Sequence, residues 1–125
     1  MNEERLYSVK EVCDRYKITR KTLFYYDRSG LLKPTRRQGK QQFKLYDDEA
    51  VSRLRLILNY RSAGLMIEEI RTIIDTNDKK TILSVLKDAK RRLTEEALEK
   101  DQELKKLDLL IDMVSRSDPS YPKER

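Results

Sequence analysis

Apolar residues recur at helical spacings near the start of the chain. Four of them follow Ser8 at positions i, i+3, i+4 and i+7, namely Val9, Val12, Cys13 and Tyr16. This spacing places them along one side of a helix, and Ser8 and Glu11 are spaced as a capping box, which predicts that the helix begins after Ser8. Because Cys13 lies on the apolar stripe, we interpret it as a buried structural thiol.

A second short helix is expected from Arg20 to Arg28. Thr19 is a suitable N-cap, and Gly30 supplies the permissive backbone that ends a helix. One face of this helix carries Leu23 and Tyr26, whereas another carries Lys21, Tyr25 and Arg28. Two short helices joined by a short turn form a helix-turn-helix, whose second helix reads the major groove of DNA.

The following segment, residues 35–42, is polar and basic and contains one glycine. Apolar residues flank it on both sides, with Leu31 and Leu32 before it and the run FKLY, residues 43–46, after it. This pattern predicts a β-hairpin, the wing of a winged helix-turn-helix.

Two further helices complete the predicted N-terminal domain. The third begins after Asp47 or Asp48 and ends near Gly64. Its apolar stripe consists of Val51, Leu54, Ile57 and Leu58. The fourth spans about residues 67–75, and its cap position holds Met66, whose side chain cannot cap. In this helix we expect burial of Ile67, Ile70 and Ile74.

Residues 79–115 contain neither Gly nor Pro, which predicts one helical rod of ~55 Å at ~1.5 Å per residue. Apolar residues follow the alternating three- and four-residue steps of a coiled-coil seam: Leu86, Leu93, Ala97, Leu104, Leu107, Ile111 and Val114. Lys90 and Lys100 interrupt this seam at core positions. Because the preceding residues already form a compact unit, we expect the long helix to self-associate.

The positive charge of the chain is concentrated in its N-terminal part. Residues 1–74 hold 16 Lys and Arg against 10 Asp and Glu, whereas the remainder holds 12 of each. Between Arg15 and Lys44 there are ten basic residues, and Asp27 is the one acid. A solvated face is the simpler interpretation of a charge run, but an imbalance of this size favours binding to a polyanion.

Composition excludes several classes of function. The 125 residues include one Cys and no His, so we expect no metal site, no internal disulfide and no cofactor. No catalytic group set is recognisable, and we expect no enzyme. No apolar run approaches the ~20 residues of a membrane span, and the N-terminus lacks the apolar core of a signal peptide. We therefore expect a cytoplasmic protein with no membrane partner.

The run from Ile18 to Pro34, ITRKTLFYYDRSGLLKP, resembles the V-S-x-R-T-L-R-Y-Y-E-x-x-G-L-L-x-P signature of MerR-family transcriptional regulators. The similarity covers about residues 6–75 and continues through FKLY, which matches the family's wing strand. It implies a mostly α-helical protein, with a winged helix-turn-helix DNA-binding domain followed by a long coiled-coil dimerisation helix. It further implies a bacterial homodimer that binds a pseudopalindromic promoter, meets RNA polymerase there, and bends or untwists the promoter spacer.

The expected DNA-binding residues come from the helix face, the basic segment and the resemblance. The resemblance places Lys21, Tyr25, Tyr26, Lys44 and Arg61 at positions that contact the DNA backbone in the family. The complete expected set is Thr19, Arg20, Lys21, Tyr25, Tyr26, Arg28, Arg36, Arg37, Lys40, Lys44 and Arg61. For Tyr26, a place in the core beside Leu23 is an equal alternative.

Several positions depart from the family pattern. Phe24 stands where Arg is frequent, which removes one phosphate contact, and Gln42 stands where Gly is frequent, which alters the wing. Lys21 and Lys44 replace arginines and keep the charge without the bidentate fork. The cysteines used by metal- and redox-sensing members are absent, and we expect no C-terminal domain large enough to enclose a drug-like ligand. Any effector is therefore expected to bind the long helices or a partner protein.

The sequence predicts three segments: the DNA-binding domain in residues 1–75, the dimerisation helix in residues 76–115 and a flexible tail in residues 116–125. Two other functions stay under consideration. One is a winged-helix architectural or recombination accessory factor that bends DNA without a direct role in transcription. The other is a coiled-coil interaction module whose basic region binds an acidic protein.

Overall fold

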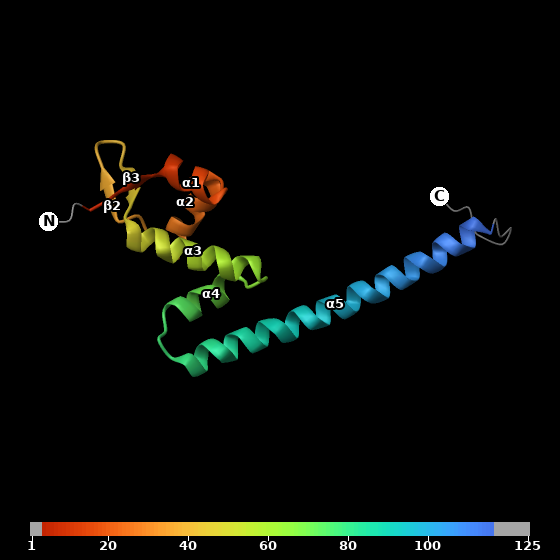
Figure 1. Ribbon diagram of the computed structural model, residues 1–125. Coiled ribbons are helices and arrows are strands. Elements are labelled where there is room, and N and C mark those ends of the chain that lie inside the picture. The colour runs from red at the N-terminus through yellow and green to blue at the C-terminus, as the bar shows by residue number, and fades with distance from the viewer. Residues whose placement is uncertain (1–3, 117–125) are drawn as a thin grey trace. The chain divides into compact units, whose positions relative to one another are not determined.

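The computed structural model describes residues 4–116, which fall into two compact units, one up to Ile82 and one from Leu83 onward. The N-terminal unit contains the short helices and the wing, and the second unit contains most of the long helix (Figure 1). Apart from Arg116, the predicted tail lies outside the described residues.

The helix-turn-helix begins at the residues that its capping signals predict. Ser8 caps α1 (Val9–Tyr16): its hydroxyl accepts a hydrogen bond from the Glu11 N–H at 3.1 Å, and the Glu11 carboxylate accepts one from the Ser8 N–H at 2.8 Å. Thr19 caps α2 (Arg20–Arg28) with its own hydroxyl. Both predicted helices are confirmed, and they pack against each other.

The wing is a β-hairpin in a small antiparallel sheet of order β1-β3-β2. The strands are β1 (Tyr7–Ser8), β2 (Arg36–Gln38) and β3 (Phe43–Tyr46). Between β2 and β3, Gly39 and Gln42 both adopt left-handed backbone angles, with φ of 77° and 56°. The hairpin confirms the predicted wing. The sequence did not predict β1, because two residues show no periodicity and their partner strand lies far along the chain.

Two helices follow the wing, α3 (Asp48–Ser62) and α4 (Ile67–Ile74), and they pack against each other. Asp47 caps α3 by accepting the Ala50 N–H at 2.8 Å. At the start of α4 the side chain of Met66 makes no capping bond, as expected, but its N–H donates to the Glu69 carboxylate at 2.7 Å. Half of a capping box therefore holds this end.

The core of the N-terminal unit draws on all four of its helices and on the wing. Its largest fully buried side chains are Val12, Leu23, Leu31, Leu32, Tyr46, Leu54, Ile57 and Ile70. Side chains of this size each contribute about 1.5–3 kcal/mol when buried, so the unit carries a core of its own.

Three predictions about burial were wrong in detail. Cys13 is only half-buried, and so are Ile67 and Ile74, whereas Ile73 is buried. Leu58, on the predicted stripe of α3, is also half-buried. In α4 the buried side of the helix is centred on Ile70 and Ile73, which are three residues apart, while Ile67 and Ile74 are the first and last residues of the helix.

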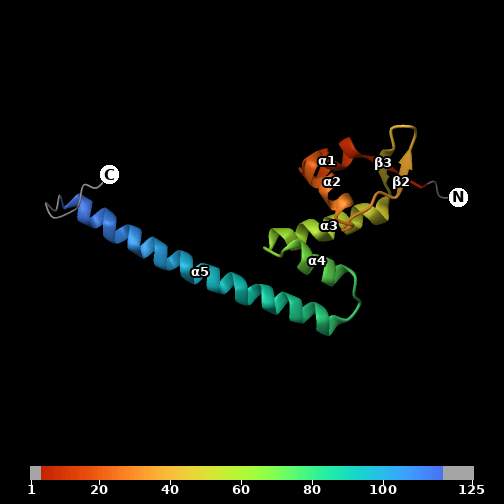
Figure 2. The same ribbon diagram turned by 180° about the vertical axis from the view of Figure 1, so that it is seen from behind.

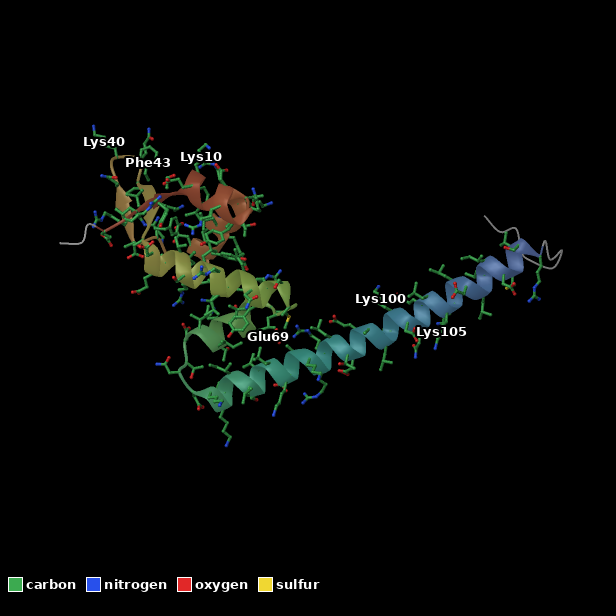
Figure 3. The ribbon with its side chains drawn as sticks, viewed as in Figure 1. Lys10, Lys40, Phe43, Glu69, Lys100 and Lys105 are labelled. Atoms are coloured by element: carbon green, nitrogen blue, oxygen red, sulfur yellow. The ribbon has the colours of Figure 1, made fainter. Side chains whose placement is uncertain are left out.

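The long helix α5 (Lys79–Ser115) has the predicted bounds and runs without interruption in both views (Figure 1 and Figure 2). From residue 97 onward its predicted seam is exposed, with Leu104 61% exposed. Lys100, which interrupts the seam, pairs with Glu103 on the same helix at 3.1 Å, and Lys100 and Lys105 project from different sides of α5 in Figure 3. The C-terminal half of α5 therefore presents an uncovered apolar stripe.

Candidate nucleic-acid interface

Helix α2 separates an apolar face from a polar one, as the sequence predicts. Leu23 and Tyr26 are buried in the core, whereas Arg20, Lys21 and Arg28 are exposed. Tyr25 is 43% exposed, and the Arg28 guanidinium carbon lies 5.9 Å from the centre of its ring. The outer face of α2 thus combines three cations with an aromatic hydroxyl, which suits contacts to phosphates and base edges.

Two of the predicted residues of this helix are also structural. The exposed Thr19 caps α2, because its hydroxyl oxygen accepts a hydrogen bond from the Thr22 N–H at 3.1 Å. Tyr26 is 4% exposed and lies in the core, the alternative considered from the sequence. Burial raises the pKa of Tyr26, and the neighbouring Arg61 guanidinium opposes this shift. Arg61 also donates to the Leu65 carbonyl at 2.6 Å, which ties it to the turn after α3.

The wing carries the other predicted cations. Arg36, Arg37 and Lys40 are exposed on β2 and the following turn, and Figure 3 shows Lys40 pointing outward at the tip of the wing. Arg36 pairs with Glu4 at 3.1 Å, an exposed ion pair that a phosphate can displace. The structure therefore places cations on α2 and on the wing within one folded unit.

Asp27 links the wing to α2. Its side chain is 7% exposed, and Arg37 Nη2 lies 3.0 Å from both carboxylate oxygens. Lys33 and Lys44 approach the same carboxylate, each with Nζ at 3.5 Å. Burial alone would raise the pKa of Asp27, but the hydrogen bonds from Arg37 and Lys33 and the charges of Arg37 and Lys44 lower it overall. The carboxylate is therefore ionised near neutral pH.

This role of Asp27 was not predicted from the sequence, although Asp27 is the one acid among the ten cations between Arg15 and Lys44. Its position means that Arg37 and Lys44, both predicted to bind DNA, already have a protein partner. Each retains exposed side-chain surface, and one carboxylate neutralises one charge of three. The cluster keeps a net positive charge and holds the wing cations in fixed positions.

Lys44 makes a second contact that the sequence did not reveal. Its ammonium lies 3.8 Å from the centre of the Phe24 ring, a cation–π contact. An open depression of about 660 Å³ is lined by Phe24, Lys44 and Arg20, and also by the start of α1 and the exposed Phe43 of the wing. This depression lies between the two elements that carry the cations.

Among residues 4–116, none of the helices combines the length and the apolar character that a membrane span requires. Within the same described range, no three His, Cys, Asp or Glu side chains gather to bind a metal. Burial raises the pKa of the half-buried Cys13, and the nearby Arg20 charge partly offsets this effect. The surface with the clearest chemical character in the described part is therefore the cationic face of α2 and the wing.

Known proteins share this arrangement. The sequence profile of the MerR HTH family regulatory protein matches residues 7–77. The transcriptional regulator AdhR of Bacillus subtilis is 32% identical over 93 residues, which are 70% of this chain and 66% of AdhR. The crystal structure of MtaN, the N-terminus of the Bacillus subtilis multidrug transporter activator, is similar with a TM-score of 0.68 and 27% identity, over 84% of this chain and 97% of that one.

The fold also occurs in HiNmlR, a MerR family regulator lacking the sensor domain, whose crystal structure holds promoter DNA. There the TM-score is 0.60 and the identity 19%, over 93% of this chain and 95% of HiNmlR. The profile match covers more than half of the present chain and includes the helix-turn-helix, the wing, α3 and α4. The chain therefore belongs to the MerR family of helix-turn-helix regulatory proteins.

Proposed function

We propose that this MerR-family protein is a transcriptional regulator that binds a pseudopalindromic promoter as a homodimer. The observation that carries the proposal is the outer face of α2, where Arg20, Lys21, Tyr25 and Arg28 are exposed beside a cationic wing. A recognition helix with a neighbouring wing can occupy a major groove and grip the flanking backbone. The described relatives are transcriptional regulators, and an architectural or recombination accessory factor is therefore not favoured.

The proposed dimer is formed by α5. Its exposed seam residues repeat with coiled-coil steps, and a helix with such a stripe is covered most simply by a second copy of itself. Two α2 helices joined in this way match two half-sites related by a two-fold axis.

The proposed mechanism is distortion of the promoter. A rigid α5 pair fixes the separation of the two DNA-binding units, so cationic contacts on both half-sites can offset a deformation that costs about 1–6 kcal/mol. Bending or untwisting the spacer would realign promoter elements for RNA polymerase, the proposed partner at the same promoter. An effector that favours one of two dimer states would then act as the switch.

The test is transcription with purified components on a promoter that contains the bound sequence, with its spacer shortened one base pair at a time. A regulator that distorts DNA activates the long spacer and represses, or leaves unchanged, the spacer of ordinary length. A promoter without the bound sequence is the matched control. Repression at every spacer length would contradict the distortion mechanism and indicate simple occlusion of polymerase.

A further inference from the structure

Phe24 is an aromatic residue of α2 that does not belong to the buried face of the helix. Leu23 and Tyr26 already supply the buried face of the helix, whereas Phe24 is half-buried and lines the depression between α2 and the wing. Arg20 lies one helical turn before Phe24 and lines the same depression. This half-buried phenyl ring therefore offers apolar surface on a helix face that otherwise carries exposed cations.

The ring of Phe24 is held in place by its surroundings. Lys44 Nζ lies 3.8 Å from the ring centre, and the same ammonium lies 3.5 Å from Asp27 Oδ2. Because Asp27 is buried and paired with Arg37, Lys44 is fixed between carboxylate and ring. Phe24 also lines the open depression, so its ring is held in place beside a space that a bound molecule can enter.

DNA presents phosphates, sugars and base edges to a protein. The exposed cations of α2 and the wing can bind the phosphates, and many kinds of side chain can contact the sugars. A phenyl ring donates no hydrogen bond, and the apolar group on a base edge in the major groove is the 5-methyl of thymine. Resting on the proposed function, we infer that Phe24 is a specificity-determining residue that contacts a thymine methyl group in the operator.

The experiment uses the full chain and the duplex that it enriches from random-sequence DNA. Each thymine of that duplex is replaced in turn by deoxyuridine, which removes the methyl group and keeps every hydrogen-bonding atom. For the wild-type chain, replacement at one or more thymines should weaken binding about fourfold, the effect of losing one buried methyl contact. For Phe24→Ala, the thymine and deoxyuridine duplexes should bind equally at that position.

Phe43→Ala is the matched control. Phe43 is also a phenylalanine of the depression and is 61% exposed, but it belongs to the wing strand β3. This variant should keep the fourfold difference between thymine and deoxyuridine. Circular dichroism of all three proteins checks that each is folded.

The inference is overturned if no single deoxyuridine weakens wild-type binding, or if Phe24→Ala keeps the same discrimination. Either result would place Phe24 against sugar or leave it without a DNA contact. If the wild-type chain enriches no sequence at all, the proposed DNA-binding function itself is wrong, and this outcome is distinct from the two above.

Discussion

In the N-terminal unit the large apolar side chains cover one another, whereas along the C-terminal half of α5 they stay exposed. Leu23 and Leu54 have no accessible surface in the first unit, but Leu104, Leu107 and Ile111 on α5 are all more than half exposed. Both regions have helical spacing of apolar residues, so the spacing alone does not separate them. What separates them is whether the chain folds back to cover the apolar face, and for α5 the cover must come from elsewhere.

The largest expected effect is on self-association through α5. Leu104→Lys with Ile111→Lys places charges at two seam positions, and losing about 1.5–3 kcal/mol per buried side chain should raise the dimer Kd by more than about 100-fold. Sedimentation at micromolar concentration should then show a monomer. Glu95→Lys, on the opposite side of the helix, is the control and should leave the dimer intact. A double variant that still sediments as a dimer would contradict the proposed seam.

The next largest effect is expected on the stability of the N-terminal unit. Asp27→Asn removes the negative charge around which Arg37, Lys33 and Lys44 gather, and we expect the free energy of unfolding to fall by about 1–3 kcal/mol. Asp14→Asn, which breaks only the exposed pair with Lys10, should cost no more than about 0.5 kcal/mol. Urea unfolding measures both free energies. Equal losses for the two variants would mean that the Asp27 cluster contributes no more stability than the exposed pair of Asp14 and Lys10.

The same carboxylate has a pH signature. The folded-state pKa of Asp27 is lowered from its ordinary value of 3.8. The unfolded chain therefore takes up this proton first, and the stability that Asp27 contributes is full above about pH 5 and is lost as pH falls through its folded pKa. Stability measured against pH should decline less steeply in acid for Asp27→Asn than for the wild-type protein.

How much the sequence could predict depended on how local each signal was. Ser8, Thr19 and Asp47 are each within three residues of the N–H that they cap. The sequence predicted the first two helix starts and narrowed the third to Asp47 or Asp48. The role of Asp27 depends on cations 6, 10 and 17 residues away, and no sequence spacing reveals such a cluster before the wing folds against α2. The cation–π contact of Lys44 with Phe24 is non-local for the same reason.

A smaller effect concerns the proposed interface. Lys21→Ala removes one exposed cation of α2, and we expect weaker binding to all DNA sequences alike, with the log–log salt dependence flatter by about 0.9. Lys106→Ala, an exposed lysine of α5, should leave the salt dependence unchanged. DNA titrations at several salt concentrations measure the binding constant and its salt dependence for each variant. A change of base preference with an unaltered slope would make Lys21 a base-reading residue instead.

The smallest expected effect lies in the turn of the wing. Gln42 has a φ of 56°, where glycine is less strained, so Gln42→Gly should raise the free energy of unfolding by about 0.5 kcal/mol despite the loss of the Gln42 side-chain bond to Gly39. Gln41→Gly, at a position without a left-handed backbone, should lower it by a similar amount. Thermal unfolding of both variants checks this, and the same sign for both would contradict it.

The most direct test of the central claim is the mass of the complex between the full chain and the DNA that it selects from a random pool. We predict that the enriched sequence is an inverted repeat and that native mass spectrometry finds two chains on one duplex. The Leu104→Lys and Ile111→Lys variant should bind the same duplex more weakly and as single chains. One wild-type chain on a single half-site, or no enriched sequence, would contradict the claim that a cationic N-terminal unit binds DNA and that α5 joins two such units.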